Sequence, residues 1–379
     1  MTNILQDITK NFSGLFGSKK GGSVIGVDIG SSSIKIVQLK NDNGVAVLET
    51  YGSVSLGTYV ENSYIGQAVN PTHDQTIQAI KDILKEANIT SLNSAVAIPS
   101  ASSLVFLLEL PKAITQKDLA TIVPTEARRF IPVPISEVSL DWWMIPEDDV
   151  LEGNDDAPAE ILGNKNDKRK VLVAAIHNEA LARFQQVVKD AQFNADFFEI
   201  EMFSNVRSCV GSKRETVALV DFGASKTKVS VVSRGVIQDF HIINRGSQDI
   251  TRVLSTGLNI SLSKAEEFKK KFGMAPNDEY SDAESIIRGS LEYVMSEINA
   301  IILAYEKKYG QSIDSVMVTG GGASLIGLVE YMQQKLPASV IKSNPFSQVK
   351  VPVFLESVLE EIGSDFGVAI GLALRKLSS

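Results

Sequence analysis

Two short stretches of the chain place an aspartate, a glycine, a serine and a lysine at the same spacing. They are VIGVDIGSSSIKIVQL, residues 24–39, and VALVDFGASKTKVSVV, residues 217–232. In each stretch an apolar run ends at the aspartate. The shared residues are Asp28, Gly30, Ser32 and Lys35 in the first stretch, and Asp221, Gly223, Ser225 and Lys228 in the second. One such match is typical of an ordinary β-hairpin, but two matches indicate an internal duplication.

The residue types in the repeated stretch suit the binding of a phosphate group. A glycine lets the backbone approach an oxyanion, and serine hydroxyls with successive N–H groups form an anion cradle. The candidates for this contact are Gly30, Ser31, Ser32, Ser33, Lys35, Gly223, Ala224, Ser225 and Lys228. Either lysine can instead be an outward-pointing strand residue.

Aspartate repels phosphate, so the two aspartates need a further explanation. Asp28 and Asp221 fit the pattern if Mg²⁺, held through water molecules, lies between the carboxylates and the phosphate oxygens. Two hairpins, one from each half of a duplicated chain, would then hold the phosphates of one nucleotide from opposite sides.

A third stretch, SIDSVMVTGGGASLIGLVEYMQQKL (residues 312–336), predicts a buried strand, a glycine turn and an amphipathic helix. Gly320, Gly321 and Gly322 leave no side chain to block a flat ring, and their amides can face a ribose or a phosphate. An ordinary strand-to-helix turn needs only one glycine. We therefore interpret this turn as the nucleoside part of the site. Its spacing differs from GxGxxG and GxxxxGK[ST], so neither a Rossmann nor a P-loop site is indicated.

The composition sets limits on the protein that positions these residues. A chain of 379 residues with 44% apolar content predicts at least two domains. The net charge of −8 argues against a nucleic-acid partner. Cys209 is the single cysteine, and His73, His177 and His241 lack the spacing of metal ligands. No apolar run is long enough to span a membrane and no secretion signal is recognised, so a cytoplasmic location is expected.

Residues 1–22 predict an amphipathic extension followed by a flexible hinge, GSKKGGS. Its apolar residues fall on one helical face; they are Ile4, Leu5, Ile8, Phe12, Leu15 and Phe16. Two interpretations stay open: packing on the protein itself or on a neighbouring copy, and a weak helix lying on a bilayer.

The two hairpins and the turn TGGGASLIGL resemble the phosphate 1, phosphate 2 and adenosine motifs of the superfamily of actin, Hsp-type chaperones and sugar kinases. This resemblance implies an α/β, duplicated, ribonuclease H-like fold with two lobes that binds ATP and Mg²⁺. Residues 244–273 resemble the segment after phosphate 2 in FtsA and PilM proteins, where a Glu and a Lys contact the ribose and adenine. By motif match these are Glu266 and Lys269, although on so charged a helix they could equally be ordinary surface residues.

Residues 101–192 predict a small inserted α+β domain. The expected strands are 104–110, 138–145 and 171–176, and the expected helices are 115–130 and 178–191. A helix followed by IPVP and an acidic-to-aromatic strand resembles the PilM family. Pro124 should kink or restart its helix, because it lacks a backbone donor. Residues 147–170 are strongly polar and predict a mobile connection.

On this resemblance the first lobe comprises residues 23–100, 193–212 and 360–379, and the second lobe comprises residues 213–359. The PilM resemblance implies an ATP-binding adaptor of type IV pilus assembly at the inner face of the cytoplasmic membrane. Its implied partner is the N-terminal cytoplasmic peptide of a PilN-type inner-membrane protein, and through it other proteins of the pilus platform. Membrane association would be peripheral or indirect, and self-association is left open. Trp142 and Trp143 are candidate peptide contacts, of which only one can be buried on a given side of the strand.

Two other functions stay open. An FtsA-like cell-division protein would normally carry a C-terminal membrane helix, whereas this sequence ends in SDFGVAIGLALRKLSS, where Gly367 and Gly371 match the last inter-lobe helix of the superfamily. A sugar-kinase-type phosphotransferase needs a carboxylate base, and Glu201 is the acidic residue placed for that catalytic role. Glu201 can also be a helix N-terminal carboxylate stabilised by the helix dipole. We therefore expect ATP binding with weak or no ATPase activity.

Overall fold

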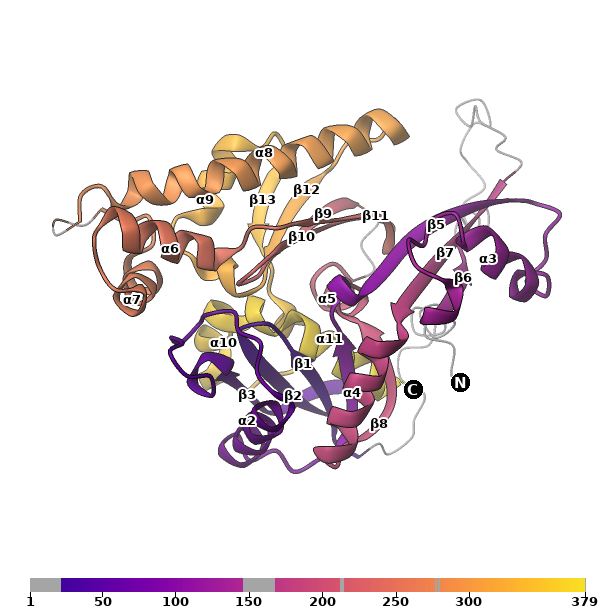
Figure 1. Ribbon diagram of the computed structural model, residues 1–379, viewed down its shortest axis with the longest axis horizontal. Coiled ribbons are helices and arrows are strands. Elements are labelled where there is room, and N and C mark those ends of the chain that lie inside the picture. The colour runs from indigo at the N-terminus through magenta and orange to yellow at the C-terminus, as the bar shows by residue number, and fades with distance from the viewer. Residues whose placement is uncertain (1–21, 146–167, 212–214, 277, 279, 379) are drawn as a thin grey trace. The chain divides into compact units, whose positions relative to one another are not determined.

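The computed structural model describes residues 22–145, 168–211, 215–276, 278 and 280–378 (Figure 1). These residues form two compact units: Ser100–Arg183 make one, and the segments on either side of it make the larger one. The extension expected for residues 1–22 lies outside the described residues except for Gly22, and so does most of the connection expected for residues 147–170.

The larger unit contains two sheets with the same topology. The first sheet has the order β3-β2-β1-β4-β8 and the second has the order β11-β10-β9-β12-β13. In both, the first three strands pair antiparallel and the last two run parallel to the central strand. This repetition confirms the predicted duplicated α/β fold with two lobes, which we call the first and the second lobe after their sheets.

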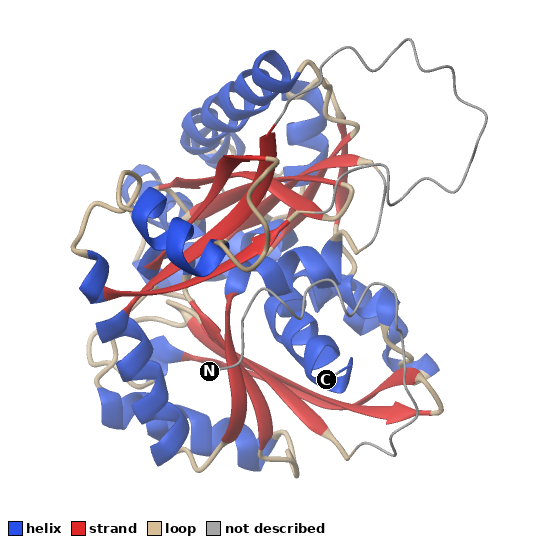
Figure 2. Ribbon diagram, turned by 90° about the vertical axis from the view of Figure 1, so that its right-hand side faces the viewer, coloured by secondary structure: helices blue, strands red, loops and turns tan. Residues whose placement is uncertain are grey.

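The strands of the first lobe are β1 (Val24–Ile29), β2 (Ser33–Asp42), β3 (Val45–Ser55), β4 (Asn93–Ile98) and β8 (Asn194–Ile200). Those of the second lobe are β9 (Thr216–Phe222), β10 (Thr227–Ser233), β11 (Val236–Ile243), β12 (Ser315–Thr319) and β13 (Ser339–Lys342). The central strands β1 and β9 are buried along nearly their whole length, which explains their continuous apolar sequences. Figure 2 shows these strands in red with helices packed around them.

Three helices support the first lobe: α2 (His73–Glu86), α5 (Glu201–Cys209) and α11 (Gly367–Ser378). Helix α2 begins at a capping box, in which Thr72 and Gln75 each accept a hydrogen bond from the other's backbone N–H. Helix α11 contacts both β1 and α5 at glycines. A Cβ atom on Gly26 would overlap the Ala369 carbonyl, and one on Gly371 would overlap the Ser204 carbonyl. These contacts explain why small residues recur where α11 crosses its neighbours.

The second lobe is covered by α6 (Ser247–Gly257), α7 (Leu262–Phe272), α8 (Ala283–Tyr309) and α9 (Leu328–Lys335). Helix α8 runs along the sheet in Figure 1. Its buried residues recur every three or four positions, as in Ile287, Leu291, Val294 and Ile298, and they join the core of this lobe. A short helix, α10 (Glu356–Ile362), precedes α11.

The smaller unit is a three-stranded antiparallel sheet with the order β5-β7-β6. Its strands are β5 (Ser103–Pro111), β6 (Val138–Met144) and β7 (Lys168–His177), and its helix α3 (Leu119–Ala127) packs against the sheet. Helix α4 (Asn178–Asp190) follows β7 directly. The expected strands and helices are therefore all present, although α3 is shorter than predicted.

Of the two outcomes predicted for Pro124, a restart of the helix is wrong, because α3 continues through this residue, and a kink stays a prediction. A proline inside a helix removes a single backbone hydrogen bond to the residue four positions before it. Leu119, Val123 and Ala127 are buried on one face of α3 and hold it against the sheet. Packing therefore outweighs the missing bond.

Trp142 and Trp143 lie on opposite faces of β6, as neighbouring strand residues must. Trp142 is partly buried and packs with the core shared with α3, whereas Trp143 is 9% exposed. Trp142 thus offers more of its surface than Trp143 does.

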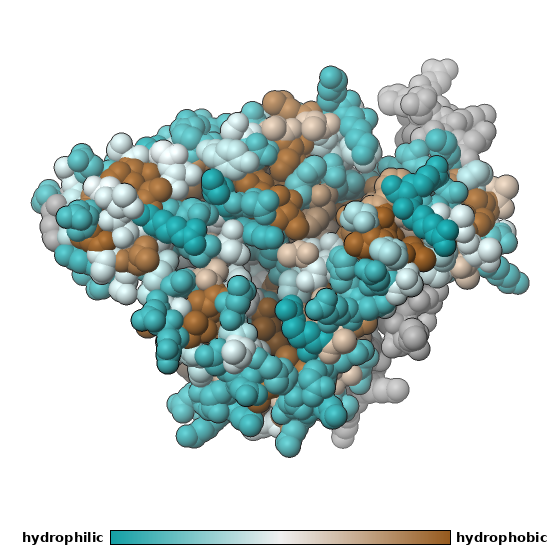
Figure 3. Space-filling view, in the orientation of Figure 1, coloured by the Kyte–Doolittle hydropathy of each residue, from teal (hydrophilic) through white to brown (hydrophobic). Residues whose placement is uncertain are grey.

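No helix in the described part of the chain has the length and apolar character that a membrane span requires. On the face shown in Figure 3, hydrophobic residues form separate patches among hydrophilic ones. Val353 and Phe354, just before α10, are large apolar residues with 80% and 79% of their surfaces exposed.

Candidate functional site

The two repeated stretches fold into the hairpins β1–β2 and β9–β10. Asp28 is paired directly with Lys35 across the first hairpin, and Asp221 is paired with Lys228 across the second. The turns close in the same way: the Gly30 N–H donates to the Ser33 carbonyl at 3.0 Å, and the Gly223 N–H donates to the Lys226 carbonyl at 3.1 Å. The two turns therefore share the same pattern of backbone hydrogen bonds.

The tips of the two turns meet. The hydroxyl oxygens of Ser31 and Ser225, one from each lobe, are 3.3 Å apart. Beside them lies a cavity of about 560 Å³ between the lobes, which is within the size range of small-molecule sites. All the predicted site residues line this cavity except Ser225. Ser225 lies next to it, because its hydroxyl contacts that of the lining residue Ser31. The fold thus gathers candidates that are far apart in the sequence.

Lys228 lies close to the turn of the second hairpin, among acidic side chains. Its Nζ is 2.9 Å from Glu201 Oε2 and 3.2 Å from Asp221 Oδ2. Burial alone would lower the pKa of Lys228, but these two carboxylates raise it, so the side chain is a cation. The interpretation of Lys228 as an outward-pointing strand residue is wrong.

Glu201 occupies the first position of α5, where the helix dipole stabilises a negative charge. It also forms the ion pair with Lys228 and lines the cavity. Both of the roles considered for this residue are therefore compatible with its position.

Asp28 is 9% exposed, and within the described residues no cation lies as close to it as Lys228 lies to Asp221. Burial raises its pKa from 3.8 to about 6, and the more distant Lys35 ammonium only partly opposes this effect. The carboxylates of Asp28 and Asp221 are hard oxygen donors of the kind that Mg²⁺ prefers. Within the described ranges no three acidic, histidine or cysteine side chains form a ready metal site. A magnesium ion here would therefore need water and phosphate oxygens as further ligands.

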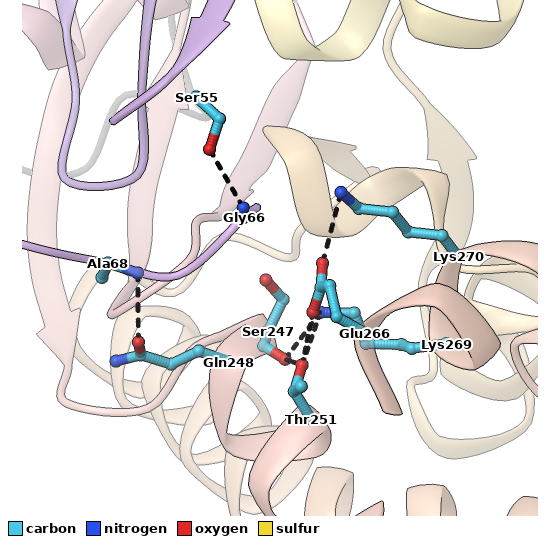
Figure 4. Close-up of polar contacts among 9 residues, drawn as sticks. All are labelled: Ser55, Gly66, Ala68, Ser247, Gln248, Thr251, Glu266, Lys269 and Lys270. Atoms are coloured by element: carbon cyan, nitrogen blue, oxygen red, sulfur yellow. Dashed lines mark hydrogen bonds and ion pairs between the residues drawn. The ribbon is translucent and has the colours of Figure 1, made fainter. Parts of the chain in front are cut away.

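Glu266 and Lys269 also line the cavity, and they form a buried polar cluster on α7 (Figure 4). The Lys269 ammonium donates to Glu266 Oε2 at 2.7 Å, to Thr251 Oγ1 at 2.9 Å and to the Ser247 carbonyl at 3.1 Å. Lys270 lies 3.4 Å from the other Glu266 oxygen. Burial would raise the pKa of Glu266, but Lys269 lowers it, whereas burial lowers the pKa of Lys269 and Glu266 only partly opposes this. The alternative that Glu266 and Lys269 are ordinary surface residues is wrong.

Packing within the protein explains why the turn after β12 consists of glycines. Gly320 adopts φ +81°, and a Cβ atom there would overlap the Asp221 carboxylate. A Cβ atom on Gly322 would overlap the Phe222 ring, and one on Gly321 would lie 2.8 Å from Asp365 Oδ1. The sequence suggested only that these glycines leave room for a flat ring. The structure shows that they also let the turn pack against the end of β9.

Sequence reasoning missed a buried ionic cluster next to the site. The Glu199 carboxylate accepts bonds from Arg207 at 2.7 Å and from Arg375 at 2.6 Å, and the Arg375 guanidinium stacks 4.2 Å from the Phe197 ring. Burial alone would raise the pKa of Glu199, but the two guanidinium groups hold it at about 2. This cluster ties β8, α5 and α11 together and so fixes the helix that presents Glu201. An arginine within the apolar sequence GLALRKL was the only signal of it.

Two lobes of equal topology, with matching hairpins that meet over a cavity of nucleotide size, define the fold of the actin-like ATPase superfamily. The chain belongs to the family described as "Type IV pilus assembly protein PilM", which matches residues 26–377. The family agrees with the resemblance found in the sequence.

Similar structures and sequences support the same fold. A solved structure of a PilM-PilN type IV pilus biogenesis complex has a TM-score of 0.75 and 24% identity, covering 93% of this chain and 98% of that chain. The ethanolamine utilization protein EutJ from Carboxydothermus hydrogenoformans has a TM-score of 0.53 and 16% identity, covering 98% and 97%. The cell division protein FtsA of Enterococcus faecalis is 24% identical over 360 residues, which are 85% of this chain and 78% of that protein.

Proposed function

We propose that this protein is an ATP-binding adaptor of type IV pilus assembly. The observation that carries the proposal is the meeting of the two repeated turns, with Ser31 and Ser225 at 3.3 Å, beside a cavity lined by both lobes. Membership of the PilM family supports type IV pilus assembly as the cellular process.

In the proposed complex the triphosphate contacts the turns 30–33 and 223–225 together with Lys35 and Lys228. The ribose and adenine lie toward Glu266, Lys269 and the turn 320–322. The cavity is lined by six acidic and four basic side chains, so it does not by itself neutralise a triphosphate. Mg²⁺ near Asp28 and Asp221 would supply the missing positive charge.

Nucleotide affinity in the presence of Mg²⁺ tests this part of the proposal. We expect both Asp28→Ala and Asp221→Ala to weaken ATP binding about tenfold or more, because each removes one lobe's contribution to the cation. Asp74→Ala, in the first turn of α2 and outside the cavity, is the matched control. Unchanged affinity in both site variants, measured by calorimetry, would contradict the proposal.

The proposed partner is the N-terminal cytoplasmic peptide of a PilN-type inner-membrane protein, through which the adaptor reaches other pilus platform proteins. Membership of the family and the likeness to a solved PilM-PilN complex support this proposal. In the inserted sheet β5 and β6 are edge strands, and an extended peptide can pair with such an edge while apolar pockets take its side chains. Trp142 on β6 is a candidate contact.

A binding experiment with the synthetic PilN-type peptide tests the partner. We expect the peptide to bind more tightly with ATP and Mg²⁺ than without them, and Trp142→Ala to weaken binding more than Trp143→Phe does. Absence of binding in both nucleotide states would argue against the adaptor function.

We propose weak or no ATP turnover: Glu201 forms an ion pair with Lys228 at 2.9 Å, and a catalytic role would require ATP binding to break this pair. Incubation of the protein with labelled ATP and a panel of sugars distinguishes such an adaptor from a sugar kinase. Phosphoryl transfer well above the rate of hydrolysis would contradict the proposal.

The proposed location is the inner face of the cytoplasmic membrane, with attachment that is peripheral or indirect through the partner. Flotation with liposomes, with and without residues 1–22, separates direct from indirect attachment. Sedimentation at several protein concentrations with ATP would reveal self-association.

A further inference from the structure

A segment of the first lobe reaches across the cavity to the second lobe. Residues 59–69, which we call the strap, connect the short 3₁₀ turn η1 (Leu56–Thr58) to the start of α2. Hydrogen bonds attach the strap to its own lobe, and two of them lie near the cavity: the Gly66 N–H donates to Ser55 Oγ at 3.1 Å, and the Val69 N–H donates to the Ser31 carbonyl at 2.9 Å. The second of these bonds ties it to the phosphate turn.

The strap also contacts the second lobe, beside the Glu266 cluster (Figure 4). The Ala68 N–H donates to Gln248 Oε1 at 3.4 Å. Gly66 lies so close to Glu266 that a Cβ atom on it would be 2.7 Å from Glu266 Oε1 and 3.3 Å from Lys270 Nζ. Burial and the Glu266 carboxylate raise the pKa of the Tyr64 phenol, so this side chain too lies near the second lobe. The strap therefore joins the two lobes beside the Glu266 cluster.

Ile65 is the unexpected residue of the strap. It lines the cavity, yet 61% of its surface is exposed, and its neighbours around the cavity are mainly serines and charged residues. Exposed apolar surface in a cavity is stabilised when a ligand with an apolar face covers it. A purine base has such a face, whereas a phosphate or a ribose does not.

We infer that the strap closes over the nucleoside and that Ile65 covers one face of the base. This inference rests on the proposed ATP binding and adds to it a specificity element supplied by the first lobe. Gly66 adopts φ +94°, in the region that favours glycine, and its missing side chain lets the strap backbone approach Glu266. Closure of the strap and binding of the nucleoside then stabilise each other across the two lobes.

Paired affinity measurements on the full chain test the inference. The dissociation constants of ATP and of inorganic triphosphate, both with Mg²⁺, are measured for the wild type, Ile65→Ser, Ile65→Leu and Gly66→Ala. Val353→Ser is the matched control, since Val353 is also an exposed apolar residue but does not line the cavity. Thermal melts show whether each variant is folded.

We expect Ile65→Ser to weaken ATP binding about five- to tenfold while triphosphate binding changes less than about twofold. Ile65→Leu should keep most of the ATP affinity. Gly66→Ala should weaken ATP binding at least as much as Ile65→Ser, because it strains the backbone and displaces the Glu266 carboxylate. The Val353→Ser control should bind both ligands as the wild type does.

If the wild type binds ATP and Ile65→Ser binds it equally well, the inference is wrong and the proposed function stands. The same holds if Ile65→Ser weakens ATP and triphosphate by the same factor, because the side chain would then act on the whole site. If the wild type binds neither ligand, the proposed function and the inference both fail.

Discussion

The two hairpins have the same sequence pattern and the same backbone, but their charged residues are in different states. In the second hairpin Lys228 is paired with Asp221 and with Glu201, within 3.2 Å of each. In the first hairpin Asp28 is buried and forms no ion pair within the described part of the chain, and its pKa rises to about 6. Burial is the main cause of the raised pKa of Asp28, whereas α5 adds to the second hairpin a carboxylate, Glu201, that Lys228 reaches.

This difference shows what a repeated motif does and does not determine. The aspartate, glycine and serine spacing determines the turn, because the hydrogen bonds that close it are local. The protonation state depends on which neighbours the rest of the fold brings near. The two carboxylates proposed to hold Mg²⁺ therefore have different surroundings before the ion binds, since Asp221 already lies 3.2 Å from Lys228.

Replacing each of the two lysines in turn should give the largest difference in stability between the hairpins. Lys228→Met leaves Glu201 and Asp221 without their common counter-ion, so the free energy of unfolding should fall by about 3–4 kcal/mol. Lys35→Met removes a part-exposed lysine and should cost less than about 1 kcal/mol. Urea denaturation at pH 7 without nucleotide measures both.

The double variant Lys228→Met with Glu201→Gln is the control for this prediction. It should recover part of the loss, because one of the two unpaired charges is gone. Equal losses in Lys228→Met and Lys35→Met would mean that the hairpins are electrostatically equivalent after all.

The pH dependence of stability should distinguish the two aspartates. Asp28 has a raised pKa, so between about pH 4 and 6 the folded chain binds more protons than the unfolded chain. The free energy of unfolding attributable to Asp28 therefore falls as the pH rises through this window. Asp28→Asn lacks this effect, and above about pH 7 it should be more stable than the wild type by about 2–3 kcal/mol.

Asp221→Asn is the comparison for that experiment. It removes one partner of Lys228 and should lower the stability at pH 7 rather than raise it. Denaturation curves from pH 4 to 8 test both variants without nucleotide. A destabilising Asp28→Asn at pH 7 would show that Asp28 is paired in a way that the structure does not contain.

The smallest expected effect concerns the contact between the tips. Ser31→Ala and Ser225→Ala should each change the free energy of unfolding by about 0.5 kcal/mol, because the hydroxyls are exposed to water. Their double-mutant cycle should give a coupling of similar size. A coupling of zero in the presence of ATP and Mg²⁺ would indicate that the tips separate when the nucleotide binds.

Much of the fold and of the candidate site was predictable from the sequence. The repeated hairpins and the strands and helices of the insertion have strong local patterns, and they lie where they were expected. The cluster of Glu199, Arg207 and Arg375 was not predictable, because its members come from three distant segments and no local pattern joins them.

Two other features needed the structure for related reasons. Residues Glu266 and Lys269 are buried only because the strap and α6 cover a helix whose own sequence is that of a surface helix. The restart expected at Pro124 depended on a local rule that the packing of α3 outweighs.

The contact of α11 with β1 has a consequence for the order of folding. The second lobe is built from one continuous part of the chain, whereas the core of the first lobe contains both Gly26 and Ala369, which come from opposite ends of the described sequence. During synthesis, β1 must wait for α11 to leave the ribosome before it can bury its inner face. We therefore expect the second lobe to become resistant to protease first, and the first lobe to be the part that depends on chaperones while the chain is still growing.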